Sequence, residues 1–176
     1  MGAESLLTRM TPGSPKLEKV DPAHGAIKQS DVAGACQGMT RCEYAILTYK
    51  YGEDRKALRP VYFRLYDVAY KLAAREGWQV PEGRDYVARM VKLAVHDLCD
   101  PNVCVMCRGN GAIGHVHCEV CDGKGRKRPS DMDRARFIGM NRAGFSRIWK
   151  GRYEAIYQAG ANIESRGLEK LARNMR

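Results

Sequence analysis

Four cysteines in two matched pairs have the spacing of metal ligands. Cys104 and Cys107 begin one C-x-x-C-x-G-x-G segment, and Cys118 and Cys121 begin another. A C-x-x-C pair lets two sulfurs from one tight turn converge on a metal, and two pairs complete a tetrahedral four-thiolate zinc site. The spacing therefore predicts zinc as the cofactor. Because protein fills all four positions, the predicted role is structural rather than catalytic.

Other ligands and other cysteines leave alternatives open. His115 and His117 flank the second pair and could each replace a cysteine, although the symmetry of the halves favours four thiolates. Iron–sulfur ligation is chemically possible, but paired turns are typical of structural zinc ribbons. Cys36, Cys42 and Cys99 have no assigned role and are interpreted as small buried or partly exposed side chains.

A predicted helix-turn-helix follows the cysteine module. Ser130 and Asp133 have the spacing of a capping box, which begins a helix. Gly139 can supply the turn, and Asn141 can cap a second helix that begins at Arg142. An ordinary amphipathic helix pair is the alternative interpretation of this segment.

The predicted second helix has an inner and an outer face. Ala135 permits a close helix crossing, and Met140, Phe145 and Ile148 are expected to lock the second helix onto the first. Gly144 should weaken this helix by ~1 kcal/mol relative to Ala, so it either permits a close approach to DNA or indicates a later start. The outer face is expected to contact bases in the major groove through Arg142, Ala143, Ser146, Arg147 and Lys150.

Basic residues around the cysteines are predicted to contact phosphates, because neutralising phosphates supplies much of the affinity for nucleic acid. The alternative is a solvated linker. These residues are Arg108, Lys124, Arg126, Lys127 and Arg128.

Charge and hydropathy limit the classes of partner. The chain has 176 residues, with 30 Lys and Arg against 20 Asp and Glu, a formal net charge of +10 that favours a polyanion such as nucleic acid. No run approaches the ~20 apolar residues of a membrane span, so no membrane partner is expected. The N-terminus lacks the apolar core of a secretion signal. We therefore expect a reducing compartment, where paired thiols bind metal.

The fold class predicted is mainly α, a small helical bundle with an inserted zinc ribbon or knuckle module and a C-terminal helix-turn-helix. One helix should begin at Thr40 and end at Gly52, a second should hold Pro60 in its first turn and stop at Gly77, and a third should cover about 84–98. The predicted divisions are a flexible tail at 1–37 that could order on a partner, helices at 38–100, the zinc module at 101–128, the helix-turn-helix at 129–160 and a helical tail at 161–176.

An apolar stripe continues beyond the predicted second helix. Trp149, Tyr153, Ile156 and Tyr157 are expected to pack against the zinc module or the helical bundle, with a dimer seam as the alternative. Gly160 is expected to end this helix.

These motifs together resemble the lambdoid bacteriophage late antitermination protein Q family. The resemblance covers about residues 100–160, includes W-K-x-R-Y-E-x-I-Y at Trp149–Tyr157, and is loose over 40–99. The cysteine pattern is shared with DnaJ-type chaperones, but those have four such repeats and a His-Pro-Asp motif in their J domain. This chain has two halves and no His-Pro-Asp.

The resemblance implies a mechanism. Proteins of this family bind a DNA element near a late promoter, engage RNA polymerase that still holds its sigma factor at a promoter-proximal pause, and make it read through terminators. It implies double-stranded DNA, bacterial RNA polymerase and sigma factor as partners, in the cytoplasm of the bacterial host. The four paired cysteines would be the zinc ligands, and the helix from Arg142 would contact the DNA element.

Two other functions remain open. One is a zinc-containing DNA-binding repressor or activator that never travels with polymerase, and the other is a chaperone-like zinc module that binds unfolded chains. An enzyme is not expected, because the sequence shows no open metal site, nucleophile elbow or phosphate loop.

Overall fold

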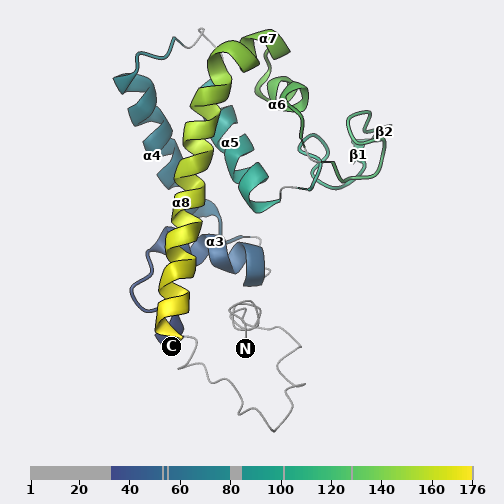
Figure 1. The fold of residues 1–176 in the computed structure, drawn as a ribbon. Coiled ribbons are helices and arrows are strands. Elements are labelled where there is room, and N and C mark those ends of the chain that lie inside the picture. The colour runs from purple at the N-terminus through teal and green to yellow at the C-terminus, as the bar shows by residue number, and fades with distance from the viewer. Residues whose placement is uncertain are drawn as a thin grey trace. The chain divides into compact units, whose positions relative to one another are not determined.

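Helices make up most of the structure, a computed structural model that describes residues 33–52, 54, 56–79, 85–100, 102–127 and 129–175 (Figure 1). The mainly α fold class is therefore confirmed. The only sheet among these residues is a two-stranded antiparallel hairpin. In chain order the elements are α3 (Arg41–Gly52), α4 (Arg59–Arg75), α5 (Tyr86–Cys99), β1 (Ala112–Ile113), β2 (Val116–His117), α6 (Asp131–Ile138), α7 (Arg142–Gly144), the π-helix η2 (Phe145–Trp149) and α8 (Lys150–Asn174).

The chain divides into two compact units. The first contains the residues up to Val61 and those from Asn162 onward, so it holds α3 and the last part of α8. The second covers Tyr62–Ala161 and holds most of α4, α5, the hairpin, α6, α7, η2 and the first part of α8. Both the cysteine module and the predicted helix-turn-helix lie in the second unit.

A capping box and a buried acid organise the first unit. The Thr40 N–H donates to Glu43 Oε2 at 2.7 Å, and the Glu43 N–H donates to Thr40 Oγ1 at 3.3 Å, as predicted. The Glu43 carboxylate is buried and lies 2.7 Å from Lys170 Nζ and 3.5 Å from Arg166 Nε. These ion pairs attach the end of α8 to the start of α3.

The predicted tail at 1–37 is ordered at its end. Residues 1–32 lie outside the described residues, but residues 33–35 are helical. The Asn174 amide donates to the carbonyl oxygens of Ala35 at 3.1 Å and Gln37 at 2.9 Å. The Asn174 side chain thus holds the end of the predicted tail against α8.

The helix boundaries of 38–100 largely match the prediction. Helix α3 ends at Gly52, Pro60 is the second residue of α4, and Gly77 adopts the left-handed conformation with φ +60° just after α4 ends. Asp85 caps α5 by accepting from the Ala88 N–H at 2.8 Å. The predicted start of α5 at 84 lies outside the described residues.

The core of the second unit is built on α5. Met90, Leu93 and Ala94 of this helix are fully buried. The Trp149 ring packs edge-on against Trp78 at 6.3 Å and Tyr86 at 5.4 Å between ring centroids. The apolar stripe of α8 therefore starts against the helical bundle, one of the two surfaces predicted for it.

The prediction that Gly160 ends a helix is wrong, because α8 continues to Asn174. Gly160 is buried inside α8, and a Cβ atom there would lie 2.9 Å from Leu98 Cδ2 and 3.4 Å from Leu65 Cδ1. The missing side chain thus serves close packing within the second unit. The predicted helical tail at 161–176 is the continuation of the same helix.

None of the described helices combines the length and the hydropathy that crossing a membrane would require.

Candidate metal centre and basic helix pair

The four paired cysteine sulfurs come together in one buried cluster. Their Sγ atoms all lie within 4.8 Å of one another. Cys104 Sγ is 3.9 Å from Cys118 Sγ, and Cys107 Sγ is 3.7 Å from Cys121 Sγ. A tetrahedron with metal–sulfur bonds of ~2.3 Å has edges of about 3.8 Å. The spacing of the sulfurs therefore fits a metal held by four thiolates, as the sequence predicted.

Each half of the module closes the other through its backbone. The Cys104 N–H donates to the Gly125 carbonyl at 2.9 Å, and the Cys118 N–H donates to the Gly111 carbonyl, also at 2.9 Å. The two halves thus exchange equivalent hydrogen bonds. The last glycine of each C-x-x-C-x-G-x-G segment supports the first cysteine of the opposite segment.

The hydrogen bonds exchanged between the two halves require glycine at the last position of each segment. Gly111 and Gly125 have φ values of +75° and +68°. A Cβ atom at Gly111 would collide with the Gly123 carbonyl, and one at Gly125 would collide with the Gly109 carbonyl. Only glycine combines the left-handed backbone with this close approach. The Gly125 N–H also points at Cys121 Sγ, 3.3 Å away, and such donors stabilise a thiolate.

The thiols of the cluster ionise differently from one another. Burial favours the neutral thiol of Cys107, but hydrogen bonds from the Gly111 backbone, the Cys121 side chain and the Gly109 backbone lower its pKa to about 7. Burial, together with the neighbouring sulfurs, raises the pKa of Cys121 to about 12. Cys107 therefore ionises before Cys121 as the pH rises, and a metal that binds four thiolates must displace the protons that remain.

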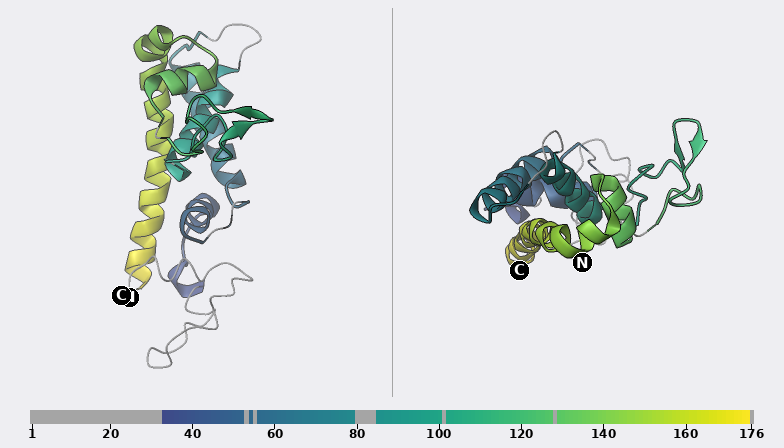
Figure 2. Two further views of the ribbon diagram at one scale, coloured as in Figure 1. Left: turned by 90° about the vertical axis from the view of Figure 1, so that its right-hand side faces the viewer. Right: turned by 90° about the horizontal axis from the view of Figure 1, so that it is seen from above.

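The histidines of the module lie on its hairpin rather than in the sulfur cluster. In the hairpin Ala112 pairs with His117 and Ile113 with Val116, and it extends away from α5 and α6 (Figure 2). His117 Nε2 lies 3.3 Å from Asp122 Oδ1 and is exposed to solvent, as is His115. Among the described residues, the side chains that lie close enough together to hold a metal ion are those of the four cysteines.

The basic residues predicted to contact phosphates have different surroundings. Arg108, Lys124 and Arg126 are exposed, and Arg108 has a left-handed backbone with φ +51°. Lys127 is exposed too, but its Nζ lies 3.1 Å from Asp133 Oδ2. Arg128 lies outside the described residues.

The predicted caps of both helices and the turn at Gly139 match the structure. Ser130 and Asp133 form the capping box, with hydrogen bonds of 3.3 and 2.9 Å that begin α6. Gly139 has φ +89°, and the Met140 N–H donates to the Ala135 carbonyl at 3.0 Å, a Schellman ending. The Gly144 N–H donates to Asn141 Oδ1 at 2.7 Å, so the cap of the second helix is also as predicted.

The second helix contains a π-helical turn that the sequence did not predict. The Lys150 N–H donates to the Phe145 carbonyl, five residues back instead of four. A turn that bonds i to i+5 holds more residues than an α-helical turn, so the residue three positions on is turned further from the first residue than in an α-helix, while the residue four positions on stays on the same side. Phe145 and Trp149 are accordingly both buried.

This register corrects one packing prediction. Phe145 packs inward as expected and Met140 is half-buried, but Ile148 is 47% exposed. An α-helical register would turn Ile148 toward the Phe145 side. The π turn instead gives the inner position to Trp149 and leaves Ile148 in solvent.

Most residues predicted to contact bases lie on the outer surface. Arg142, Ala143, Ser146 and Arg147 are exposed. Lys150 is half-buried, and its Nζ lies 2.8 Å from Asp131 Oδ2 in α6. This ion pair joins the two helices, so the charge of Lys150 is partly balanced inside the pair.

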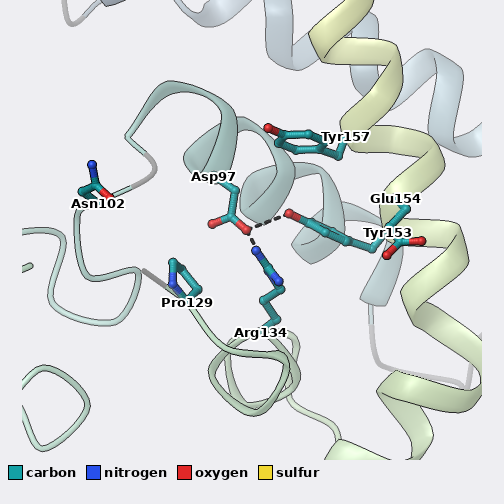
Figure 3. Close-up of a pocket in the computed structure, with 7 residues that line it drawn as sticks. All are labelled: Asp97, Asn102, Pro129, Arg134, Tyr153, Glu154 and Tyr157. Carbon is teal, nitrogen blue, oxygen red and sulfur yellow. Dashed lines mark hydrogen bonds and ion pairs between the residues drawn. The ribbon is translucent and has the colours of Figure 1, made fainter. Parts of the chain in front are cut away.

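A buried carboxylate that sequence reasoning missed holds the pair on the bundle. Asp97 of α5 accepts from Arg134 Nε of α6 at 2.9 Å and from the Tyr153 hydroxyl of α8 at 2.7 Å (Figure 3). Burial opposes ionisation, but the hydrogen bonds from His96, Tyr153 and Arg134 hold the pKa of Asp97 below its usual value. The sequence does show an acidic residue within the apolar stripe of α5, which could have indicated a buried carboxylate. It does not show which distant residues bind that carboxylate.

Asp97 lies on the wall of a pocket of about 350 Å³. In Figure 3 the Asp97, Arg134 and Tyr153 side chains converge on one wall, with their polar atoms directed at one another. The pocket lining therefore contributes to attaching α6 and α8 to α5. The full lining is Asp97, Asn102, Pro129, Arg134, Tyr153, Glu154 and Tyr157.

Comparison with known proteins gives no relative: no protein-family model matches the chain, and no curated protein matches its sequence. Its function must therefore be inferred from the cysteine cluster, the basic helix pair and the motif resemblance.

Proposed function

We propose that this chain is a zinc-stabilised protein that binds double-stranded DNA and regulates transcription. The observation that carries the proposal is the outer surface of the second helix. There Arg142 and Arg147 are exposed and enter none of the ion pairs found among the described residues, while the inner surface is fixed by Phe145 and Trp149.

Zinc is the metal that suits the cluster best. Four thiolates at tetrahedral spacing match the soft, closed ligand sets of structural zinc sites. The residues that would hold it are Cys104, Cys107, Cys118 and Cys121. When bound it would supply rigidity rather than chemistry, because no coordination position is left for water or substrate.

The helix pair suits the major groove of DNA. A helix, a tight turn and a second helix with an exposed basic N-terminal part have the organisation of a helix-turn-helix. The guanidinium groups of Arg142 and Arg147 can each pair with a guanine edge or a phosphate. Exposed Arg108, Lys124 and Arg126 in the neighbouring module add positive charge suited to phosphate contacts.

DNA binding is tested with matched arginine variants. Arg147→Ala should weaken binding to a selected duplex by ~1–3 kcal/mol while changing binding to random DNA little, if it contacts a base. Arg173→Ala is the control, because it removes the same charge from an exposed site near the end of α8. Equal losses on both DNAs would assign Arg147 to phosphate, and no loss on either would contradict the proposed surface.

The more specific proposal is late-gene transcription antitermination in a bacterial host. It is supported by the motif resemblance, which adds RNA polymerase and its sigma factor as partners. Transcription with purified polymerase on a phage late-promoter template, with and without the protein, tests it. Terminator readthrough that depends on the DNA element is expected. A change confined to promoter activity would instead assign the chain to the repressors or activators.

A further inference from the structure

We infer that Ile148 is a specificity-determining residue that contacts the methyl group of a thymine in the major groove. This inference rests on the proposed DNA binding and deepens it by naming a base. Its starting point is the exposure of Ile148, 47% of whose surface is open to solvent beside Arg147.

The π turn puts three consecutive side chains outside. Phe145 and Trp149 take the buried positions at its two ends, and Ser146, Arg147 and Ile148 between them are all exposed. An aliphatic side chain thus stands in a polar, cationic row. Trp149 fills the inner position beside Phe145, and about half of the Ile148 surface stays open to solvent.

The charge of this surface indicates its partner. No acidic residue occurs between Asn141 and Tyr153, and Arg142 and Arg147 are both exposed. A polyanion is therefore the complementary partner. In duplex DNA the apolar group available at a base edge in the major groove is the thymine C5 methyl, for which aliphatic side chains are suited.

The neighbours of Ile148 along the helix leave room for a close approach. Positions three and four residues apart are neighbours on a helical surface, and around Ile148 these are Gly144, Gly151, the buried Phe145 and the half-buried Arg152. A Cβ atom at Gly151 would meet nothing within 4 Å, so packing inside the protein does not require glycine there. Glycine at two of these four positions leaves space for a groove wall beside Ile148.

The experiment uses the full chain with zinc and a library of random duplexes. The preferred duplex is isolated, and each thymine is then replaced singly by deoxyuridine, which lacks only the C5 methyl group. Burying one methyl corresponds to roughly a fourfold change in affinity. One replacement should therefore weaken binding of the unchanged protein about fourfold, while the others have little effect.

The matched variants decide which side chain contacts the methyl. Ile148→Ala should bind the selected duplex more weakly and lose its sensitivity to that one replacement, whereas Arg147→Ala should bind weakly but keep the sensitivity. Gly151→Ala should weaken binding while leaving the thermal unfolding midpoint equal or higher. Circular dichroism and zinc content verify that each variant is folded.

The outcomes separate the inference from the proposed function. A selected sequence with no methyl-sensitive position, or an Ile148→Ala variant that keeps the sensitivity, overturns the inference alone. If the Gly151→Ala variant binds the selected duplex with unchanged affinity, DNA does not closely approach the helix surface around Ile148. A library that yields no preferred sequence overturns sequence-specific DNA binding itself, and the inference with it.

Discussion

At the scale of single residues, the geometry of the cysteine cluster depends on individual backbone hydrogen bonds. Cys104 and Cys118 each receive a backbone hydrogen-bond partner from the opposite half, so the metal ligands and the turns form one unit. A metal bound by four sulfurs would join these two segments directly. Small modules of this kind commonly fold only with metal.

Replacing one ligand should therefore release the metal. Cys107→Ser is expected to lower zinc affinity by roughly hundredfold or more, because a hydroxyl is a poor substitute for a thiolate. Metal analysis after dialysis measures how much zinc the variant retains. Cys36→Ser is the control, since Cys36 lies in the first unit. Zinc content that stays unchanged in Cys107→Ser would refute the assignment.

The pKa values predict how metal affinity varies with pH. Thiolates bind the metal, so affinity should fall as pH decreases. Above about pH 7 Cys107 is already ionised, whereas below it one further proton must be displaced. A plot of log affinity against pH should therefore become steeper, by about one proton, as pH falls through 7. Competition with a chelator of known proton affinity measures the slope, and a constant slope would contradict it.

At the scale of elements, Asp97 joins three helices. It belongs to α5 and binds Arg134 of α6 and Tyr153 of α8. The Arg89 guanidinium of α5 adds a hydrogen bond of 3.0 Å to the Ile138 carbonyl at the end of α6. Helix α6 is only eight residues long, too short to persist alone, so these polar contacts to α5 fix its orientation.

Asp97→Asn should destabilise the second unit by about 3 kcal/mol, because it leaves the half-buried Arg134 without its closest charge partner. Tyr153→Phe should cost about 1 kcal/mol, since Asp97 keeps its ion pair. Denaturant unfolding followed by the fluorescence of Trp78 and Trp149 reports on this unit. The double variant should lose less than the sum of the two losses, because both remove contacts of one carboxylate. Strict additivity would show that the contacts are independent.

At the scale of the whole molecule, positive charge is distributed over both candidate surfaces. The net charge of +10 attracts any polyanion, but only exposed cations can release counterions from DNA. On the cysteine module and the second helix, the exposed cations that enter none of the ion pairs found among the described residues are Arg108, Lys124, Arg126, Arg142 and Arg147.

Salt dependence measures how many of these cations contact phosphates. If all five do, the slope of log affinity against log salt should be about −4.5 on random duplex DNA. Neutralising Lys124 and Arg126 together should reduce its magnitude by about 2, whereas Arg173→Ala should leave it unchanged. A slope near zero would exclude DNA binding by this surface and favour a chaperone-like module.

Local features of this protein follow directly from its residue types. The two C-x-x-C turns, the capping boxes at Thr40 and Ser130, and the turn at Gly139 depend on residues a few positions apart. Their geometry is set by short-range sterics and hydrogen bonds, which the residue types specify directly.

Contacts between distant segments became known from the tertiary structure. Gly160 lies inside α8 where Leu98 occupies the space that a side chain would need, and Ile148 faces solvent where a π turn leaves Trp149 in the inner position. The partners of Asp97 come from segments 37 and 56 residues away. Such contacts follow from how side chains fill the space between helices, and no local pattern of residues encodes them.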